Sequence, residues 1–245
     1  MFIHIVPNQT KNPSFRKHKY LSMTHIQEQI NVIKNTLPQG VRLVAVSKYH
    51  PIEALQEAYD TGQRIFGESK VQEMTQKFET LPKDIEWHFI GHLQTNKIKY
   101  MASYVSLIHG VDSFKLLKEI DRQANKVKRI IPCLLQIHIA QEDTKFGFTM
   151  DECRTMLNEN QWKDLIHVQI VGVMGMATNT DNEAQVESEF AALSDFFREM
   201  KETYFKDKPY FKEISMGMSD DYPIAVKNGS TLVRVGSKIF GERVY

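Results

Sequence analysis

A lysine that directly follows an apolar segment is the first residue with an evident chemical use. Lys48 comes after residues 41–47 and precedes Tyr49-His50-Pro51. Partial burial disfavours the charged form of a lysine and leaves a neutral amine, which can attack an aldehyde to form a Schiff base. Lysines at the ends of strands are also commonly solvated loop residues, so the position by itself leaves both interpretations open.

A glycine and a serine near the other end of the sequence have the pattern of a phosphate cradle. Gly236 and Ser237 follow the apolar residues 231–235, and backbone N–H groups at the start of a helix can bind a phosphate. Ser215 closes the preceding apolar segment and adds a hydroxyl group. The alternative is that these glycines and serines only form tight turns and helix caps.

Two nearby patterns have simpler explanations. We expect Ser219 to N-cap a helix over residues 220–228 that Gly229 ends. His88 and His92 are four residues apart, but they fall in and just after an expected strand, where that spacing separates side chains by more than about 10 Å. We therefore expect no metal site.

Eight short apolar segments alternate with longer segments of helical periodicity. This alternation is typical of repeated strand and helix units around a parallel sheet, and it predicts a single (β/α)8 TIM barrel of the α/β class. The expected strands are residues 42–46, 64–66, 87–90, 104–108, 132–139, 168–173, 211–215 and 231–235.

Several of the intervening segments begin with helix start signals. Ser113 precedes an amphipathic segment at residues 114–127, and Thr149 with Glu152 forms a capping-box pattern. One further helix, at residues 22–37, comes before the first strand, and we expect it to pack outside the barrel.

The barrel would bring the lysine and the phosphate cradle together. Reactive side chains stand at the carboxyl ends of barrel strands, and the eighth strand lies beside the first. Lys48 would therefore face Gly236 and Ser237 across neighbouring strands. An aldehyde with a phosphate tail fits both groups, and pyridoxal 5′-phosphate (PLP) has that chemistry.

Composition limits the remaining function classes. The chain has 245 residues, 42% of them hydrophobic, and a formal net charge of +1. This composition is that of a globular protein, and the charge provides no general attraction for nucleic acid. The two cysteines are too few for a disulfide framework, and no apolar segment approaches the about 20 residues that span a bilayer. We expect a soluble, cytoplasmic protein that binds neither nucleic acid nor membranes.

Residues 1–22 differ from the rest of the chain. They contain four basic residues and no acidic residue. We expect a loose N-terminal extension followed by the barrel over residues 23–245. Met23 as the natural start is the favoured explanation for this segment, and a transit peptide is the alternative.

The motifs together resemble the YggS/PROSC family of pyridoxal-phosphate homeostasis proteins, whose barrel is similar to the N-terminal domain of alanine racemase. The Trp87–Lys97 and Ser215–Gly241 blocks carry the most specific part of this resemblance. The matching segments are Val46-Ser47-Lys48, Phe66-Gly67-Glu68, Val71-Gln72-Glu73, Trp87-His88-Phe89-Ile90-Gly91-His92-Leu93-Gln94, Asn96-Lys97, Val111-Asp112-Ser113, Lys145-Phe146-Gly147, Met216-Gly217-Met218-Ser219-Asp220-Asp221-Tyr222, Val233-Arg234-Val235-Gly236 and Ile239-Phe240-Gly241.

The resemblance implies a role for each matching residue. Lys48 would hold PLP as a Schiff base, and Arg234 would face the pyridine nitrogen. Ser215, Gly236 and Ser237 would bind the phosphate. A cation opposite the ring nitrogen disfavours protonation of that nitrogen and so limits carbanion chemistry.

The sequence also departs from these families. Ser69 and Lys70 replace the asparagine and tyrosine of the family's Phe-Gly-Glu-Asn-Tyr motif, and Ser69 is expected to take over the contact to the cofactor. Where alanine racemase has a ring-stacking histidine, this chain has Met174-Gly175-Met176. Met174, Met176, Met216 and Met218 form either a soft floor under the ring or ordinary core. We expect no counterpart of the racemase's C-terminal domain, which supplies its second base.

These features predict a monomeric, non-catalytic PLP carrier that acts in vitamin B6 homeostasis and amino-acid balance, with PLP-dependent apoenzymes as recipients. One alternative is a fold-type III PLP enzyme such as an amino-acid racemase. A second alternative is a cofactor-free Schiff-base aldolase that uses Lys48 on a sugar phosphate.

Overall fold

The computed structural model describes residues 23–142 and 146–242. The expected extension over residues 1–22 lies outside the described residues, as does Lys145 of the Lys145-Phe146-Gly147 motif. None of the helices in the described part of the chain is both long and apolar enough to cross a membrane.

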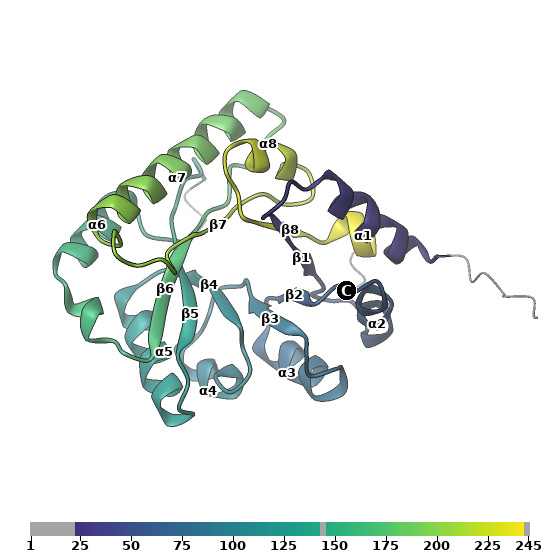
Figure 1. Ribbon diagram of the computed structural model, residues 1–245, viewed down its shortest axis with the longest axis horizontal. Coiled ribbons are helices and arrows are strands. Elements are labelled where there is room, and N and C mark those ends of the chain that lie inside the picture. Colours follow the sequence, from purple (N-terminus) through teal and green to yellow (C-terminus); the bar gives the residue numbers. More distant parts are fainter. Residues whose placement is uncertain (1–22, 143–145, 243–245) are drawn as a thin grey trace, which may run out of the picture.

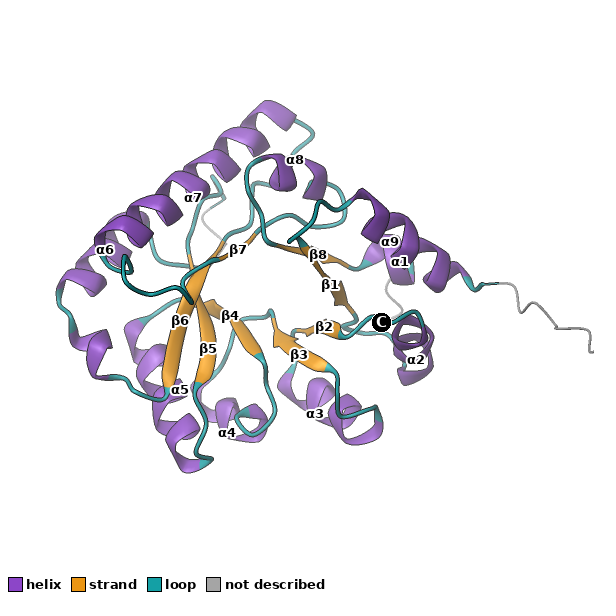
Figure 2. Ribbon diagram, in the orientation of Figure 1, coloured by secondary structure: helices purple, strands orange, loops and turns teal. Residues whose placement is uncertain are grey.

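Eight parallel strands form a closed barrel, and each strand pairs with the next in sequence while the last pairs with the first (Figure 2). This arrangement confirms the (β/α)8 fold. The strands are β1 (Arg42–Val46), β2 (Ile65–Glu68), β3 (Glu86–Phe89), β4 (Leu107–Val111), β5 (Ile131–Gln136), β6 (Val168–Met174), β7 (Glu213–Ser215) and β8 (Leu232–Val235).

Helices surround the barrel as an outer layer (Figure 1). The expected first helix is present and packs against the second and the last helices. The helices are α1 (His25–Thr36), α2 (Ile52–Asp60), α3 (Val71–Thr80), α4 (Ile98–Met101), α5 (Phe114–Lys126), α6 (Met150–Asn158), α7 (Glu183–Thr203), α8 (Tyr222–Lys227) and α9 (Ser237–Phe240), with 3-10 turns at Thr95–Lys97 and Gln161–Asp164.

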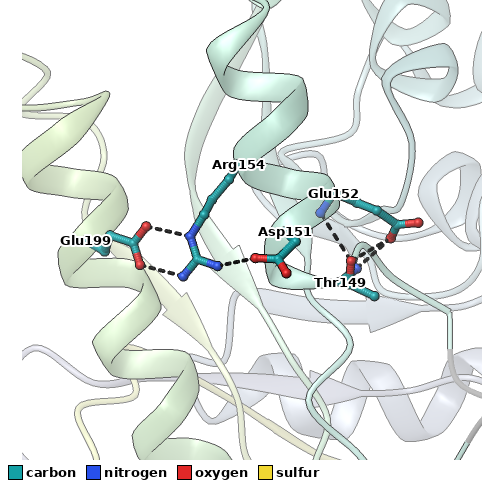
Figure 3. Close-up of polar contacts among 5 residues, drawn as sticks. All are labelled: Thr149, Asp151, Glu152, Arg154 and Glu199. Carbon is teal, nitrogen blue, oxygen red and sulfur yellow. Dashed lines mark hydrogen bonds and ion pairs between the residues drawn. The ribbon is translucent and has the colours of Figure 1, made fainter.

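Two start signals from the sequence are confirmed, and one of them opens a charged contact between helices (Figure 3). Thr149 and Glu152 form the expected capping box at the start of α6. Arg154, one turn later, makes a two-pronged contact with Glu199 of α7 at 2.7 Å for each pair of atoms, and it binds Asp151 at 2.6 Å. We call Asp151, Arg154 and Glu199 the α6 cluster. Ser113 likewise caps α5 by accepting from the Leu116 N–H.

The largest boundary error concerns β4, which the sequence placed at residues 104–108. Tyr104 and Val105 instead belong to the turn after α4, where their N–H groups both donate to the carbonyl of Met101. Their side chains pack in the helix layer rather than in the strand. The strand therefore starts at Leu107 and extends to Val111, so that His109 lies within it.

Alternation along the strands separates the barrel interior from the helix layer. The apolar interior cluster consists of Val44, Ile65, Leu107, Leu134, Val171, Met174 and Leu232. Ser47 directly follows β1, and its carbonyl accepts from Lys77 of the helix layer. Lys48 comes next and is half-buried at the carboxyl end of the barrel.

Candidate functional site

Lys48 lies in a tight turn at the carboxyl end of β1, as expected. The turn closes with a hydrogen bond of 3.1 Å from the His50 N–H to the Ser47 carbonyl, and Lys48 itself is half-buried. Tyr49 adopts a left-handed backbone conformation with φ of 68°. Turns of this shape favour glycine, so a tyrosine there indicates that neighbouring contacts hold the backbone.

A buried polar cluster lies behind this turn, between β1, β2 and α3. We call Ser47, Glu68, Glu73 and Lys77 the α3 cluster. Lys77 donates to the Ser47 carbonyl at 2.8 Å, to Glu68 at 2.8 Å and to Glu73 at 2.7 Å. The Ser47 hydroxyl donates to Glu68 at 2.6 Å, and Glu73 accepts from the Tyr49 N–H at 2.6 Å.

Burial dominates the electrostatics of this cluster. The side chain of Glu68 is fully buried, and that of Lys77 is 5% exposed. Burial raises the pKa of Glu68 to about 7, although Lys77 and Ser47 act in the opposite direction. The sequence placed Glu73 in a family motif but assigned no role to Glu73 or Lys77, because four-residue spacing of opposite charges on a helix is typical of solvated pairs.

Arg234 of β8 extends into the barrel beside β1. It is 5% exposed, and its residue pairs with Val44, which faces the interior. Its guanidinium donates to the Ser215 hydroxyl at 2.6 Å and to the Gly175 carbonyl at 3.1 Å. Burial lowers the pKa of Arg234 to about 10, so the group stays cationic at neutral pH.

Ser215 is buried, and two side chains engage its hydroxyl inside the barrel. Besides Arg234, the ring of His109 binds it through Nδ1 at 2.9 Å. His109 Nε2 lies 3.0 Å from His88 Nδ1, so a chain of four polar groups crosses the barrel. Phosphate binding by Ser215 remains a prediction, and the present geometry assigns its hydroxyl to this polar chain.

The cation at one end of the chain favours one direction for the hydrogen bonds. Arg234 donates to Ser215, and we expect the hydroxyl proton to be directed to His109 Nδ1 and the proton of His109 to lie on Nε2, directed to His88. Burial lowers the pKa of His88 to about 3 and that of His109 well below its usual value. Both rings are therefore neutral. The misplaced β4 boundary hid His109 from sequence reasoning.

Gly236 and Ser237 lie where β8 passes into α9. Gly236 is the N-cap of α9, and Ser237 is exposed. A side chain on Gly236 would bring its Cβ within 3.0 Å of the Val46 carbonyl oxygen, so glycine permits the ends of β8 and β1 to approach closely. This approach places the expected phosphate cradle next to the strand that leads to Lys48.

The expectation that Ser219 caps α8 is wrong. The helix starts at Tyr222, and Asp221 occupies the cap position. The Ser219 hydroxyl instead accepts from the Gly236 N–H at 3.3 Å. The physical reason is that Asp221 binds the Met218 N–H at 2.5 Å and forms a turn before the helix. Ser219 therefore belongs to the same corner of the barrel as Gly236.

The two weaker cofactor candidates lie at the barrel mouth. Ser69 is half-buried directly after β2, and Gly91 after β3 approaches its carbonyl so closely that a Cβ there would lie 2.6 Å away. Met176 is half-buried and packs against the interior cluster. The four methionines do not form one floor: Met174 and Met176 belong to the interior, Met216 to the helix-facing core, and Met218 is exposed.

His88 and His92, which the sequence places four residues apart, have separate surroundings. His88 belongs to the polar chain, whereas His92 binds Asp112 at 3.0 Å and stacks on Phe146 at 4.2 Å between ring centroids. Within residues 23–142 and 146–242, no group of three or more histidine, cysteine, aspartate or glutamate side chains has a metal-binding arrangement.

Known proteins are similar to this chain in sequence and in fold. Residues 21–244 match the model of the alanine racemase N-terminal domain family. Two relatives named pyridoxal phosphate homeostasis protein come from Aquifex aeolicus, with 36% identity over 83% of this chain and 88% of the relative, and from Haemophilus influenzae, with 35% identity over 90% and 97%.

A solved relative extends the likeness to three dimensions. The structure of PipY from Synechococcus elongatus without PLP matches this chain with a TM-score of 0.83 and 37% sequence identity. The structure of PipY with PLP bound matches it with a TM-score of 0.79 and 36% identity. In both cases the match covers 88% of this chain and all of PipY. The chain belongs to the alanine racemase N-terminal domain family and, within it, to the pyridoxal phosphate homeostasis proteins.

Proposed function

We propose that this protein binds PLP reversibly through a covalent bond to Lys48 and takes part in PLP homeostasis. The observation that carries the proposal is the placement of a half-buried lysine at the carboxyl end of β1, the strand that pairs with β8 and its buried cation Arg234. PLP supplies an aldehyde that condenses with a primary amine. The PLP-bound structure of PipY and the names of the relatives support the same cofactor.

The donor set suits each part of this cofactor. Lys48 provides the amine, and Gly236 and Ser237 provide backbone and hydroxyl groups for a phosphate at the start of α9. Arg234 is proposed to face the pyridine nitrogen, where a buried cation opposes protonation of that nitrogen. Ser69 and Met176 are the proposed contacts on the other sides of the mouth.

A carrier without efficient catalysis is the proposed role. The guanidinium of Arg234 donates hydrogen bonds to the Ser215 hydroxyl and the Gly175 carbonyl, and these bonds fix its charge inside the barrel. A fixed cation near the ring nitrogen weakens the electron withdrawal on which amino-acid racemisation depends. The relatives are named homeostasis proteins, which supports the same conclusion. Delivery to PLP-dependent apoenzymes, a monomeric state and a cytoplasmic location complete the proposal.

The deciding experiment is a visible absorbance titration of the purified protein with PLP, followed by borohydride reduction and peptide mass mapping. We expect a new absorbance band and a pyridoxyl group on Lys48. The band should disappear in Lys48→Ala and persist in Lys99→Ala, which removes an exposed lysine of α4. A wild-type protein that forms no band would overturn the proposal.

The same samples separate the alternatives. Turnover of L- or D-alanine by the PLP-loaded protein would identify a racemase instead of a carrier. A borohydride adduct on Lys48 with a sugar phosphate, in protein that forms no band with PLP, would identify a Schiff-base aldolase.

A further inference from the structure

The turn that carries Lys48 has a backbone conformation that its own sequence disfavours. Tyr49 has a φ of 68°, in the left-handed region, although a bulky side chain is strained there. Such conformations persist where surrounding contacts determine them, and they gather at functional sites. The contacts that hold Tyr49 therefore bear on how Lys48 is presented.

Helix α3 supplies contacts on both sides of Lys48. Glu73 accepts from the Tyr49 N–H at 2.6 Å, and Lys77 donates to the Ser47 carbonyl at 2.8 Å. Glu73 and Lys77 also bind each other at 2.7 Å. The backbone immediately before Lys48 and the backbone immediately after it are thus attached to one turn of the same helix.

Glu68 of β2 stabilises the contact between α3 and the Lys48 turn. Its carboxylate accepts from the Ser47 hydroxyl at 2.6 Å and from Lys77 at 2.8 Å. Removing two charges from water is expensive, and hydrophobic packing would fill the same space at lower cost. A buried ion pair at this position is therefore weak evidence for stability and better evidence for a positional role.

We propose that Glu73 and Lys77 are positioning residues that hold the Ser47-Lys48-Tyr49 turn so that the Lys48 amine is directed into the barrel mouth. Glu68 keeps Lys77 in place. This inference rests on the proposed function, because it assigns to these residues the presentation of the PLP-binding amine. The α3 cluster acts from the helix layer and needs no contact with the cofactor.

Variants of Glu73 and Tyr49 test the proposal directly. Glu73→Ala removes the acceptor of the Tyr49 N–H, and we expect PLP affinity measured by the absorbance band to fall at least about tenfold, since small misplacements of a reacting group have large effects. Glu73→Gln keeps an acceptor oxygen and should retain most of the affinity. Tyr49→Gly in the Glu73→Ala background should recover part of the loss, because glycine adopts positive φ without strain.

A measurement without cofactor reports on the amine itself. Reductive methylation of the protein with ¹³C-formaldehyde allows the pH titration of Lys48 to be followed by NMR, with Lys48→Ala to assign the signal. We expect Glu73→Ala to change the chemical shift and the titration midpoint of Lys48. Glu73→Gln should leave both close to their wild-type values.

Glu199→Gln is the matched control, because it weakens an ion pair of the α6 cluster while leaving the Lys48 turn untouched. It should change neither PLP affinity nor the Lys48 titration. Wild-type affinity and an unchanged Lys48 titration in Glu73→Ala would overturn the positioning role. So would a loss of affinity that Glu199→Gln reproduces at an equal decrease in melting temperature. Failure of the wild type to form the band would instead reject the proposed function.

Discussion

The α3 and α6 clusters contain the same charges, one cation and two carboxylates, in opposite surroundings. In the α3 cluster the side chains of Lys77 and Glu68 are 5% and 0% exposed, whereas in the α6 cluster those of Arg154 and Asp151 are 35% and 92% exposed. Water screens the charges of the exposed α6 cluster much more than those of the buried α3 cluster. If the α3 cluster positions the Lys48 turn as we propose, burial rather than charge composition decides whether an ion pair can control a neighbouring backbone.

The two clusters also shift carboxylate pKa values in opposite directions. Hydrogen bonds from Arg154 lower the pKa of Glu199, because the half-exposed carboxylate gains a partner while retaining contact with water. Burial raises the pKa of Glu68 despite the presence of Lys77. A partner cation thus offsets only part of the desolvation in the α3 cluster.

Removing the cation from each cluster gives the largest expected difference. Lys77→Met leaves Glu68 buried without its cation, and we expect a decrease of about 3–5 kcal/mol in the free energy of unfolding. Arg154→Met should cost about 1 kcal/mol or less. Urea denaturation of both variants measures this. Equal losses would show that burial does not separate the clusters, and Glu68→Gln added to Lys77→Met should recover part of the larger loss.

The pH dependence of stability sharpens the contrast. The pKa of Glu68 rises from 4.5 to about 7 on folding, so the folded state binds the proton more tightly. The free energy of unfolding should therefore fall as pH rises from about 4.5 to 7, by up to about 3 kcal/mol from this group. Denaturation curves across this range should show a fall that Glu68→Gln removes. An unchanged pH profile in that variant would contradict the assignment.

The polar chain inside the barrel is a third case, in which a neutral hydroxyl group binds a buried cation. Ser215→Ala removes the acceptor of a buried Arg234 N–H, and we expect a loss of about 1–3 kcal/mol in the free energy of unfolding.

Two-dimensional ¹H–¹⁵N NMR should find both His109 and His88 neutral with the proton on Nε2 in the wild type. A protonated His109 in the wild type at neutral pH would disprove the proposed direction of the chain.

The smallest effect is expected on the surface. Glu199→Gln should lower the free energy of unfolding by about 1 kcal/mol or less, and the difference from the wild type should shrink in 1 M salt. The contribution of Glu199 is present above its unfolded pKa and is lost as pH falls through its lowered folded pKa. A loss that salt does not reduce would place the α6 cluster closer to the buried type.

Local patterns were sufficient to predict the fold. Strand and helix alternation identified the barrel, and the barrel rule then placed Lys48 and Gly236 at the ends of neighbouring strands. These inferences succeed because they depend on periodicity, which survives small boundary errors.

Features that depend on tertiary burial were not predictable. Glu73 and Lys77 have the spacing of an ordinary surface pair, and only the packing of α3 on β1 and β2 removes Lys77 from water. His109 was missed because Tyr104 and Val105 have strand-like side chains in a helical turn. The assignment of Ser219 to a helix cap was wrong because Asp221, two residues later, occupies that position.

Barrel closure has a consequence for the order of events during synthesis. Lys48 belongs to the first strand and Arg234 to the last, and the two strands pair directly. A nascent chain therefore carries Lys48, the proposed PLP-binding lysine, for most of its synthesis without the strand that closes the barrel. Competence to take up PLP should arise in the final stage of folding, and the cofactor would then selectively stabilise only chains that have finished.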